Sequence, residues 1–573
     1  MQWFRSKVEI PKTAYCGLLP FIPSRQPRAD SLSAASSKLE GVATSSAGLA
    51  GVQPDLQTTV TPGQIACLLT YAGFLALWAY AELTEFTRRG RRPSSQDEEL
   101  GPLKESPPVM QPLGVSQIEL HLQSHNSKDV VPDTSIAGSG FVRCLLLDHL
   151  ALVECKPTLK AVVECCTILL WFYVVDRTSL LPYGDKQYSR DVLGFIFLAL
   201  TLVAFFTSLK QCRVAALLNR QQTEEWKGWM QVLFLLYHYF EAKEMYNAIR
   251  VFIAGYVWMT GFGNFSYYYK TGDFAFARFC QMMWRLNFLV VLVCVALQNS
   301  YMLYYICPMH TLFTIMVYAA LGLGHKYNKT RIGITCKLLG CVAVVFVCWD
   351  IKPVFYAIWS PFTWLVGYSD PRKPDADLLH EWYFRSSLDR YVWIHGMLFA
   401  YMHPRFEAAL QRIDKFAIGA RLSIRAAIIA VTLTLFATWY HFIYLLPKHE
   451  YNRMHPYTSW IPITLWVVLR NMTPAMRHFS LSLYGWLGCI TLETYISQFH
   501  TWLATGIPNG QPKMLLTFFS PNLPLLNFAA STAGKVLHLP ALLTVLSSTE
   551  FRGRCAADLA AFTLCCLHAF VQS

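Results

Sequence analysis

Long apolar runs, separated by short polar segments, follow one another along most of the 573-residue chain. About 20 apolar residues are enough for a helix to cross the hydrocarbon core of a bilayer. The runs lack the alternating pattern of a membrane barrel, so helices are the spanning structure that satisfies the backbone in lipid. Because several runs are short, the pattern predicts an all-α polytopic membrane protein with about 11–15 transmembrane helices. The candidate runs lie near residues 64–83, 159–175, 192–209, 228–244, 247–263, 286–306, 309–323, 333–349, 354–368, 388–402, 424–446, 458–470, 480–503, 525–546 and 556–571.

The polar segments divide the chain into four parts. Residues 1–60 are rich in Ser and Ala without periodicity, which predicts a disordered tail, with an organelle transit peptide as the alternative. Residues 61–84 are the first predicted transmembrane helix, and the Pro/Ser-rich residues 85–142 are a predicted linker. Residues 143–573 are predicted to form one multi-span domain without internal repeats.

Composition agrees with a membrane protein and excludes a soluble one of this size, because 54% of the residues are hydrophobic and 15% are charged. The net charge of +13 comes from Lys and Arg that gather between apolar runs, as in cytosolic loops, so it requires no nucleic acid partner. The 17 cysteines show no metal-binding or redox spacing, and many lie inside apolar runs as small hydrophobic residues. No metal site is predicted.

The basic segments predict an orientation. RRGRR after the first span and the segments 210–227, 270–285 and 325–337 are all basic. Placing them in the cytosol alternates with the spans up to about residue 350, with the N-terminus in the lumen and Lys227 at the cytosolic face. The runs 354–368 and 388–402 leave the later count open.

The first polar cluster within an apolar run is EEWKGWMQVLFLLYHYF, residues 224–240. Lys227 and His238 are eleven positions apart, so on a helix they share one face about 16 Å apart. Lys227 would lie at one membrane surface and His238 near the midplane, with Gln231 between them. The imidazole suits a general base. The alternative is structural, with the histidine bonded to a neighbouring helix and the lysine reaching the interface.

The second cluster combines single cations with a glycine-spaced helix. Arg250 enters IRVFIAGYVWMTGFGNFSYYY, residues 249–269, in which Gly255, Gly261 and Gly263 would allow close helix contact. This structural interpretation is favoured there. In the RLN triplet, Arg285 and Asn287 begin a later span, and Arg285 can serve as an interfacial anchor.

Two further clusters carry carboxylates. Glu381, Arg385 and Asp389 follow at i, i+4 and i+8, which favours a structural charge ladder. Glu493, Ser497 and His500 fall at i, i+4 and i+7 in WLGCITLETYISQFHTWL, residues 486–503. A carboxylate and an imidazole on one face of an apolar helix favour a function in proton handling.

Several of these segments resemble the Cas1p-type multi-span membrane acyltransferase family, and within it most closely the plant reduced-wall-acetylation proteins. The likeness covers about residues 61–84 and 143–530 and fades after about 533. The pattern Lys227-X10-His238 also resembles the Arg/Lys-X10-His signature of the related acyltransferase-3 membrane enzymes. The segments that carry the resemblance are RQQTEEWKGWMQVLFLLYHYF, YNAIRVFIAGYVWMTGFGNFSYYY, FCQMMWRLN, YYICPMHTLF, LLHEWYFRSSLDRY, YNRMHPYTSWIPITLWVVLRN and LGCITLETYISQFHTWL.

The resemblance implies an O-acetyltransferase of the Golgi membrane that acts on cell-wall polysaccharides such as xylan, pectin, xyloglucan or mannan. Cytosolic acetyl-CoA is the implied co-substrate, and membrane lipid surrounds the protein. We assign catalytic roles to His238, Glu493 and His500, and acetyl-CoA binding to Lys227, Trp226, Arg250 and Arg285. We expect the remaining polar residues to shape the site: Gln231, Asn287, Glu381, Arg385, Asp389 and Arg470.

The resemblance has departures that bear on partners. The chain shows no Gly-Asp-Ser block of the lumenal serine-esterase-like domain that animal and fungal relatives carry. This matches the plant branch, for which lumenal trichome-birefringence-like acetyltransferases are the expected partners. Cys489 stands where the family usually has lysine. The rival class is a transporter of acetyl-CoA or another acetyl donor without chemistry. A scaffold for lumenal enzymes is a third option.

Overall fold

Helices make up nearly all of the regular structure in the computed structural model, which describes residues 60–90, 149–212, 216–372, 374–520 and 523–532. The predicted tail, most of the predicted linker and the apolar run 556–571 lie outside the described residues. The α-helices are α2 (Pro62–Gly90), α5 (His149–Arg177), α6 (Arg190–Ser208), α7 (Arg220–Phe240), α8 (Tyr246–Thr271), α9 (Phe276–Leu297), α10 (Ile306–Gly322), α11 (Arg331–Val345), α12 (Lys352–Trp359), α13 (Thr363–Val366), α14 (His380–Leu388), α15 (Val392–Asp414), α16 (Ile418–Trp439), α17 (Lys448–Thr458), α18 (Trp460–Asn471), α19 (Pro474–His478), α20 (Ser482–Cys489) and α21 (Thr491–Gln498).

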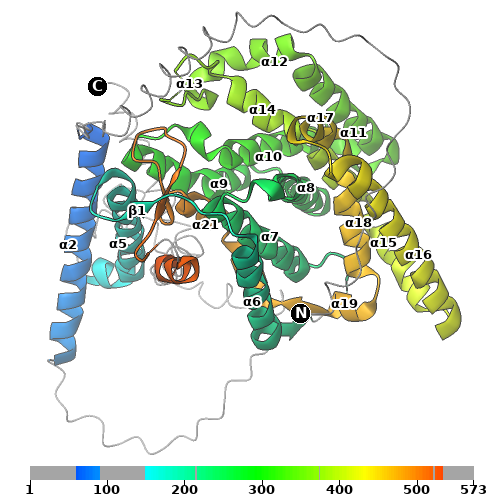
Figure 1. Cartoon of the computed structure of the whole chain (residues 1–573), viewed down its shortest axis with the longest axis horizontal. Helices are drawn as coiled ribbons and strands as arrows, with labels where there is room; N and C mark the ends of the chain where they lie inside the picture. Colours follow the sequence, from blue (N-terminus) through cyan, green and yellow to red (C-terminus); the bar gives the residue numbers. More distant parts are fainter. Residues whose placement is uncertain (1–59, 91–148, 213–215, 373, 521–522, 533–573) are drawn as a thin grey trace, which may run out of the picture. The chain divides into compact units, whose positions relative to one another are not determined.

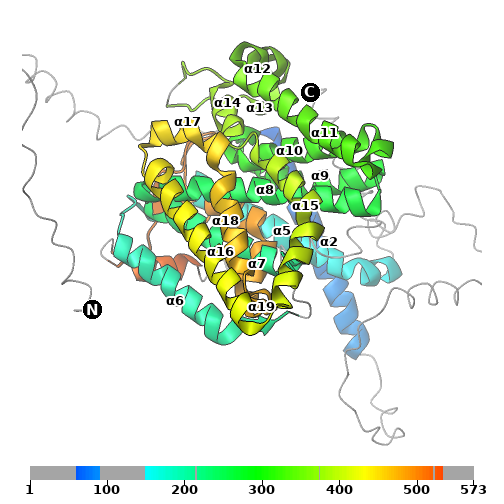
Figure 2. The same cartoon turned by 90° about the vertical axis from the view of Figure 1, so that its right-hand side faces the viewer.

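Six stretches of helix in the described part of the chain are long and apolar enough to cross a membrane. Their lengths run from 19 to 27 residues, which matches the thickness of a bilayer core. The predicted all-α, multi-pass membrane architecture is therefore confirmed. The six stretches are Pro62–Thr87, Cys155–Arg177, Arg190–Ser208, Phe276–Leu297, Arg331–Asp350 and Ile418–Tyr444. Figures 1 and 2 show α8, α9 and α10 side by side in the middle, with α2, α11 and α16 toward the outside.

The helices α7, α8 and α15 are also as long as a span, with 21, 26 and 23 residues. They are absent from the six because they carry polar side chains, some of them fully inside the protein. Gln231 of α7 and Arg250 of α8 are both buried. Neighbouring helices thus shield these two polar side chains from lipid, which is where intramembrane polar groups are tolerated.

Two helix pairs approach so closely that only glycine fits at the crossing. A Cβ on Gly228 of α7 would lie 1.8 Å from the carbonyl oxygen of Tyr484, and one on Gly488 of α20 would lie 1.9 Å from that of Glu224. A Cβ on Gly261 of α8 would lie 2.1 Å from the carbonyl oxygen of Trp393 in α15. Small residues at such crossings allow backbones to pack directly.

The predicted role of glycine in α8 is therefore confirmed at Gly261. At Gly255 a Cβ would make an ordinary contact, 3.4 Å from Sδ of Met230. At Gly263 it would meet nothing within 4 Å, so the close approach does not extend to that position.

Two small antiparallel sheets tie distant segments together. In the first sheet β5 (Met514–Leu516) lies between β1 (Tyr183–Gly184) and β4 (Leu503–Ala504). In the second, β2 (Leu209–Gln211) pairs with β3 (Phe479–Leu481), in the register Leu209 opposite Leu481. The second sheet joins the end of α6 to the start of α20 (Figure 1).

Helix α7 runs between two ends of the bundle, which we name after residues that it carries. At the His238 end, α8 begins beside η8 (Tyr440–Tyr444), because Asn247 Nδ2 donates to the carbonyl oxygen of Tyr444 (2.7 Å). At the Lys227 end, β2 and β3 pair, and Arg470 contacts Glu225 at 3.2 Å. Arg470 therefore lies at the same end of α7 as Lys227.

Candidate active site

Helix α7 holds Lys227 and His238 in one unbroken element. Asn219 caps its start, because the side-chain oxygen accepts from the backbone N–H of Gln222 at 2.8 Å. The helix ends at Phe240, where Glu241 adopts a left-handed conformation with φ 53°. His238 therefore lies in the last turn of α7, at the opposite end of the helix from Lys227.

The imidazole of His238 faces a cavity of about 200 Å³. Its ring packs against Phe234, Tyr237 and Phe499, with ring centroids 4.7, 5.0 and 6.0 Å away. Neither ring nitrogen makes a hydrogen bond within the described part of the chain. The aromatic rings thus fix the imidazole in place while its nitrogens stay available to a ligand. The structural alternative of a histidine bonded to a neighbouring helix does not hold.

The cavity next to His238 is lined by charged and aromatic side chains. Arg250 enters it from the first turn of α8, Arg385 from α14 and Lys448 from the start of α17. The sequence-based assignment of Arg250 to acetyl-CoA binding beside Lys227 does not fit this placement, because Arg250 lies at the His238 end. The lining residues are Phe234, Tyr237, His238, Tyr246, Ile249, Arg250, Ile253, Met302, Leu303, Tyr305, Tyr368, Glu381, Phe384, Arg385, Lys448, Phe499 and Gln511.

At the other end of α7, Lys227 is partly exposed and already paired. Its Nζ lies 2.6 Å from Oε2 of Glu224, one turn earlier on the same helix. Trp226 is buried and packs against Trp258 and Trp466, with ring centroids 5.8 and 6.3 Å away. A phosphate that binds Lys227 must therefore compete with Glu224, and Trp226 supports the helix packing.

Gln231 links the middle of α7 to two neighbouring helices. Its Nε2 donates to Oγ1 of Thr494 in α21 at 3.0 Å. The Tyr256 hydroxyl of α8 donates to the carbonyl oxygen of Lys227 at 2.7 Å and lies 3.3 Å from Oε1 of Gln231. The predicted site-shaping residue Gln231 thus fixes α7 against both α8 and α21.

Glu493 lies near the Lys227 end. The carboxylate is buried in the first turn of α21, and Lys227 and Arg285 both interact with it electrostatically. Arg285 itself is exposed on α9. Three residues that the sequence singled out separately are therefore within electrostatic range of one another, which supports a polar site at this end.

His500 is not a neighbour of Glu493 in the way that its spacing predicted. The apolar segment breaks at Ile490, and α21 ends at Gln498, so His500 lies beyond the helix. Its Nδ1 lies 3.5 Å from Oδ2 of Asp176, and its Nε2 lies 2.5 Å from the hydroxyl of Tyr304. The side chain is fully buried.

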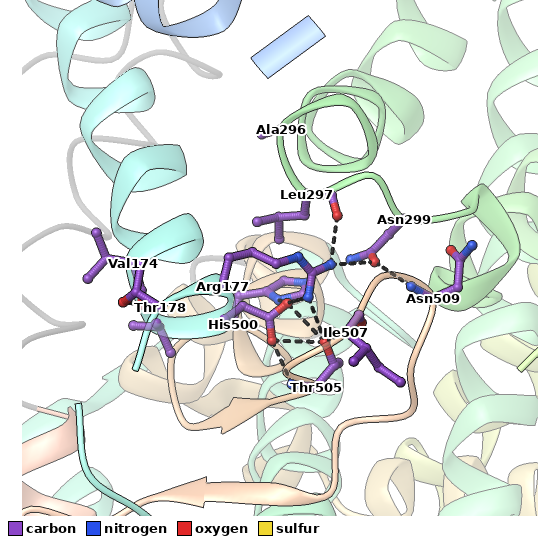
Figure 3. Close-up of polar contacts among 12 residues, drawn as sticks. Val174, Arg177, Thr178, Ala296, Leu297, Asn299, His500, Thr505, Ile507 and Asn509 are labelled. Carbon is purple, nitrogen blue, oxygen red and sulfur yellow. Dashed lines mark hydrogen bonds and ion pairs between the residues drawn. The ribbon is translucent and has the colours of Figure 1, made fainter. Parts of the chain in front are cut away.

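Asp176 and Arg177, the last two residues of α5, organise a buried polar cluster around His500 (Figure 3). Arg177 Nη1 lies 2.7 Å from Oδ2 of Asp176, and Arg177 Nη2 donates to Asn299 Oδ1 at 3.0 Å. The backbone N–H of Thr505 donates to Asp176 Oδ1 at 2.6 Å. These contacts join α5 to the residues after α9 and to the segment after α21.

Sequence reasoning missed Asp176 and Arg177, although a signal for them exists. Both end the apolar run TILLWFYVVDR, and the rule for ionisable groups in a span applies to them. It also missed His310, whose Nδ1 lies 2.8 Å from Oγ1 of Thr260. Lys227 and Asp389 both interact electrostatically with His310.

The remaining predicted residues have structural partners. Arg385 Nε lies 3.1 Å from Oε2 of Glu381, which confirms the first rung of the predicted ladder. Asp389 does not continue it, because its Oδ1 faces Nε2 of His455 at 3.3 Å. Asn287 Nδ2 donates to Oγ1 of Thr311 at 3.1 Å, joining α9 to α10.

Within the described residues, no group of three or more His, Cys, Asp or Glu side chains is placed to hold a metal ion. The chemistry that remains is that of an imidazole in a cavity with neighbouring cations. Such a group can remove a proton from a hydroxyl, or accept an acyl group as a nucleophile.

Comparison with known proteins places this arrangement among acyltransferases. A family model described as the ten-span acyl transferase domain found in Cas1p matches residues 119–537. The N-acetylneuraminate (7)9-O-acetyltransferase of Danio rerio is 31% identical over 394 residues, which cover 66% of this chain and 48% of the relative. The chain therefore spans about half the length of this relative. No solved structure gives a significant match.

Proposed function

The chain belongs to the family of ten-span membrane acyltransferase domains found in Cas1p, and we propose that it transfers acetyl groups from cytosolic acetyl-CoA to a sugar hydroxyl. The observation that carries the proposal is His238, whose ring nitrogens make no hydrogen bond among the described residues and face a cavity. The named relative supports the reaction type, since its name describes O-acetylation of a sugar acid.

Two routes for the acetyl group balance chemically. In the first, His238 takes the proton of the sugar hydroxyl while the oxygen attacks the thioester carbonyl. The carbon–sulfur bond breaks, and the proton passes to the leaving thiolate of CoA. In the second, a ring nitrogen of His238 attacks the thioester carbonyl, the carbon–sulfur bond breaks, and the proton on the other ring nitrogen passes to the leaving thiolate of CoA. The sugar hydroxyl, or a partner enzyme, then takes the acetyl group as the carbon–nitrogen bond breaks, and the hydroxyl proton returns to the imidazole.

The positions of Lys227 and His238 suggest how the donor approaches. Lys227 and Arg285 offer positive charge for CoA phosphates at the Lys227 end. The pantetheine arm then extends along α7 past Gln231 toward His238. Glu493, within electrostatic range of both cations, tunes the charge at the entrance. His500 holds the wall behind Phe499 and has no direct part in the transfer.

We further propose cell-wall polysaccharide as the acceptor and the Golgi membrane as the location. Lumenal trichome-birefringence-like acetyltransferases are the proposed partners for the final transfer. These finer assignments rest on the resemblance of the segments quoted above. Acetylation of xylan, pectin, xyloglucan and mannan, measured separately in a line that lacks the protein, will identify the acceptor.

The test uses the purified full chain in sealed liposomes supplied with acetyl-CoA labelled in the acetyl group. We expect labelled acetyl transfer with free CoA remaining outside, because the chain cleaves the thioester. His238→Ala should reduce thioester cleavage about 100-fold or more. The matched control is His449→Ala, an exposed histidine near the same cavity.

The rival transporter predicts a different distribution of label. CoA would then appear inside the liposomes together with the acetyl group, and no thioester would be cleaved. Normal thioester cleavage by the His238→Ala variant would show that His238 takes no part in the reaction. Uptake of intact acetyl-CoA would show that the protein is a transporter and not an enzyme.

A further inference from the structure

The cavity beside His238 carries more positive charge than the transfer of a neutral acetyl group requires. Arg250, Arg385 and Lys448 line it, and Glu381 is the one carboxylate among the lining residues that the structure describes. Glu381 is already paired with Arg385 at 3.1 Å. The charges of Arg250 and Lys448 therefore remain without an acidic partner on the cavity wall.

Arg250 is the most unusual of the three cations. Its side chain is 2% exposed, and its Nε donates to the hydroxyl of Tyr246 at 3.1 Å. The guanidinium carbon lies 5.4 Å from the ring centroid of Tyr246 and 5.6 Å from that of Phe384. Its Nη1 is buried and has no hydrogen-bond partner in the described part of the chain.

Among the described residues, no acidic side chain forms an ion pair with the guanidinium of Arg250. Asp389 interacts electrostatically with Arg250, but its short contact is with His455 at 3.3 Å. Across the described residues, no ion pair within 4.0 Å involves Arg250. Burying a charged donor without a partner costs free energy. A buried arginine of this kind on a cavity wall is typical of a site for an anionic ligand.

The other walls suit a sugar ring. Arg385 holds the ring of Tyr305 from one side, with its guanidinium carbon 4.3 Å from the ring centroid. The Tyr368 hydroxyl accepts a hydrogen bond from Nε2 of Gln511 at 2.9 Å, which fixes a second aromatic ring of the cavity. Aromatic faces with a few fixed polar groups are the usual lining of a small-molecule site.

We propose that this cavity binds an acceptor sugar that carries a carboxylate, as uronic acids do. The guanidinium of Arg250 donates to the carboxylate, and Lys448 supplies a second positive charge from the cavity wall. A sugar bound in this way lies within the same cavity as His238, which places one of its hydroxyls beside the imidazole. The inference rests on the proposed function and adds the acceptor class to it.

A carboxylate fits this cavity better than a phosphate of the donor. Under the proposed function the phosphates of acetyl-CoA lie at the Lys227 end, about 16 Å along α7 from His238. Arginine binds planar carboxylates through its fixed fork of N–H donors. The cavity offers one buried fork, which matches the single charge of a uronic acid.

The experiment measures binding without turnover. The purified full chain in nanodiscs is titrated with a trisaccharide of galacturonic acid, with the methyl ester of that trisaccharide, with a neutral galactose trisaccharide and with CoA. We expect the acid to bind at least tenfold more tightly than its methyl ester or the neutral sugar. Arg250→Gln should weaken binding of the acid about tenfold and leave the weak binding of the ester unchanged.

Two further variants keep the test sharp if Arg250→Gln folds poorly. Lys448 is exposed, so Lys448→Gln should fold normally and weaken binding of the acid about threefold. Arg453→Gln removes an exposed cation of the same helix, α17, that does not line the cavity, and should change nothing.

Several results would overturn the inference. Equal affinity for the acid and its methyl ester would show that the cavity does not recognise the carboxylate. Displacement of the acid by CoA, with both ligands dependent on Arg250, would show that the cavity binds donor phosphates. If neither sugar acid nor ester binds while labelled acetyl transfer to a neutral oligosaccharide persists, the acceptor class fails and the proposed function stands.

Discussion

His500 is paired with Asp176 across the bundle, with Nδ1 3.5 Å from Oδ2, and both side chains are fully buried. The contact joins the end of α5 to the segment that follows α21. Because Arg177 and Thr505 bind the same carboxylate, Asp176 serves as the anchor of the whole cluster.

Asp176→Asn should destabilise the protein strongly, because it leaves Arg177 buried without a full countercharge. We expect a loss of about 3–5 kcal/mol. Thermal unfolding in detergent, followed by intrinsic fluorescence, measures it. His500→Gln should cost less, and the double variant should show a coupling of about 0.5–3 kcal/mol. Strictly additive losses would mean that the two side chains act independently.

Gly261→Ala should disrupt the crossing of α8 and α15. The added methyl group would lie 2.1 Å from the carbonyl oxygen of Trp393, so the helices must separate. Gly263→Ala is the matched control in the same helix, since its methyl group meets nothing within 4 Å. The control should leave the unfolding temperature unchanged or raise it, because Ala favours helix by about 0.5–1 kcal/mol. Similar unfolding temperatures for the two variants would contradict the close crossing.

Glu493→Gln tests whether the buried carboxylate near Lys227 and Arg285 takes part in the reaction. The substitution keeps the shape and removes the charge, so we expect activity to fall about tenfold, equivalent to about 1.4 kcal/mol on the barrier. The liposome assay with labelled acetyl-CoA measures it. Glu450→Gln, an exposed carboxylate on α17, is the control. Wild-type activity together with wild-type stability would make Glu493 purely structural.

None of the three glycosylation sequons at Asn264, Asn328 and Asn471 should carry a glycan. All three side chains are buried. Asn264 lies inside α8. Asn328 Nδ2 donates to the carbonyl oxygen of Leu321 at 2.9 Å. Endoglycosidase treatment should leave the mobility of the expressed protein unchanged. A shift that Asn328→Gln abolishes would place that loop in the lumen and reverse the predicted orientation.

Lys186, in the loop between α5 and α6, should make stability depend on pH in an alkaline window. Burial lowers its pKa from the ordinary 10.5 to about 8. Between these values the folded protein has released a proton that the unfolded chain still binds, so stability rises with pH. Lys186→Met removes this rise, whereas the exposed Lys243→Met keeps it. Unfolding temperatures at pH 7.5 and 9.5 provide the comparison, and equal slopes for all three proteins would rule out the effect.

The apolar pattern predicts the membrane class and most helices, because burial in lipid constrains the type of side chain at every position of a span. The apolar pattern does not show where a run is broken into shorter helices. The family description counts ten spans within residues 119–537, and the apolar helix Pro62–Thr87 precedes that range, which agrees with the predicted range of about 11–15. The run 354–368 is divided among α12, η7 (Ser360–Phe362) and α13, and the run 480–503 is broken between α20 and α21. Short breaks of this kind leave average hydropathy unchanged.

Local spacing predicts contacts within one helix and fails across helices. The pair Glu381–Arg385 follows from an i, i+4 spacing. The pairing of His500 with Asp176, and of Asp389 with His455, depends on how distant helices pack. The location of Arg250 beside His238 follows from the tight turn between α7 and α8, because that turn returns the chain to the same end of the bundle.

Helix α7 sets a fixed length between Lys227 and His238. It is continuous from Arg220 to Phe240, and the contact of Gly228 with the backbone of α20 prevents it from sliding. Under the proposed function, α7 acts as a ruler of about 16 Å between Lys227 and His238. The protein then selects its donor by reach. A thioester at the tip of a long arm meets the imidazole, whereas a short activated acetyl compound held at the same entrance does not.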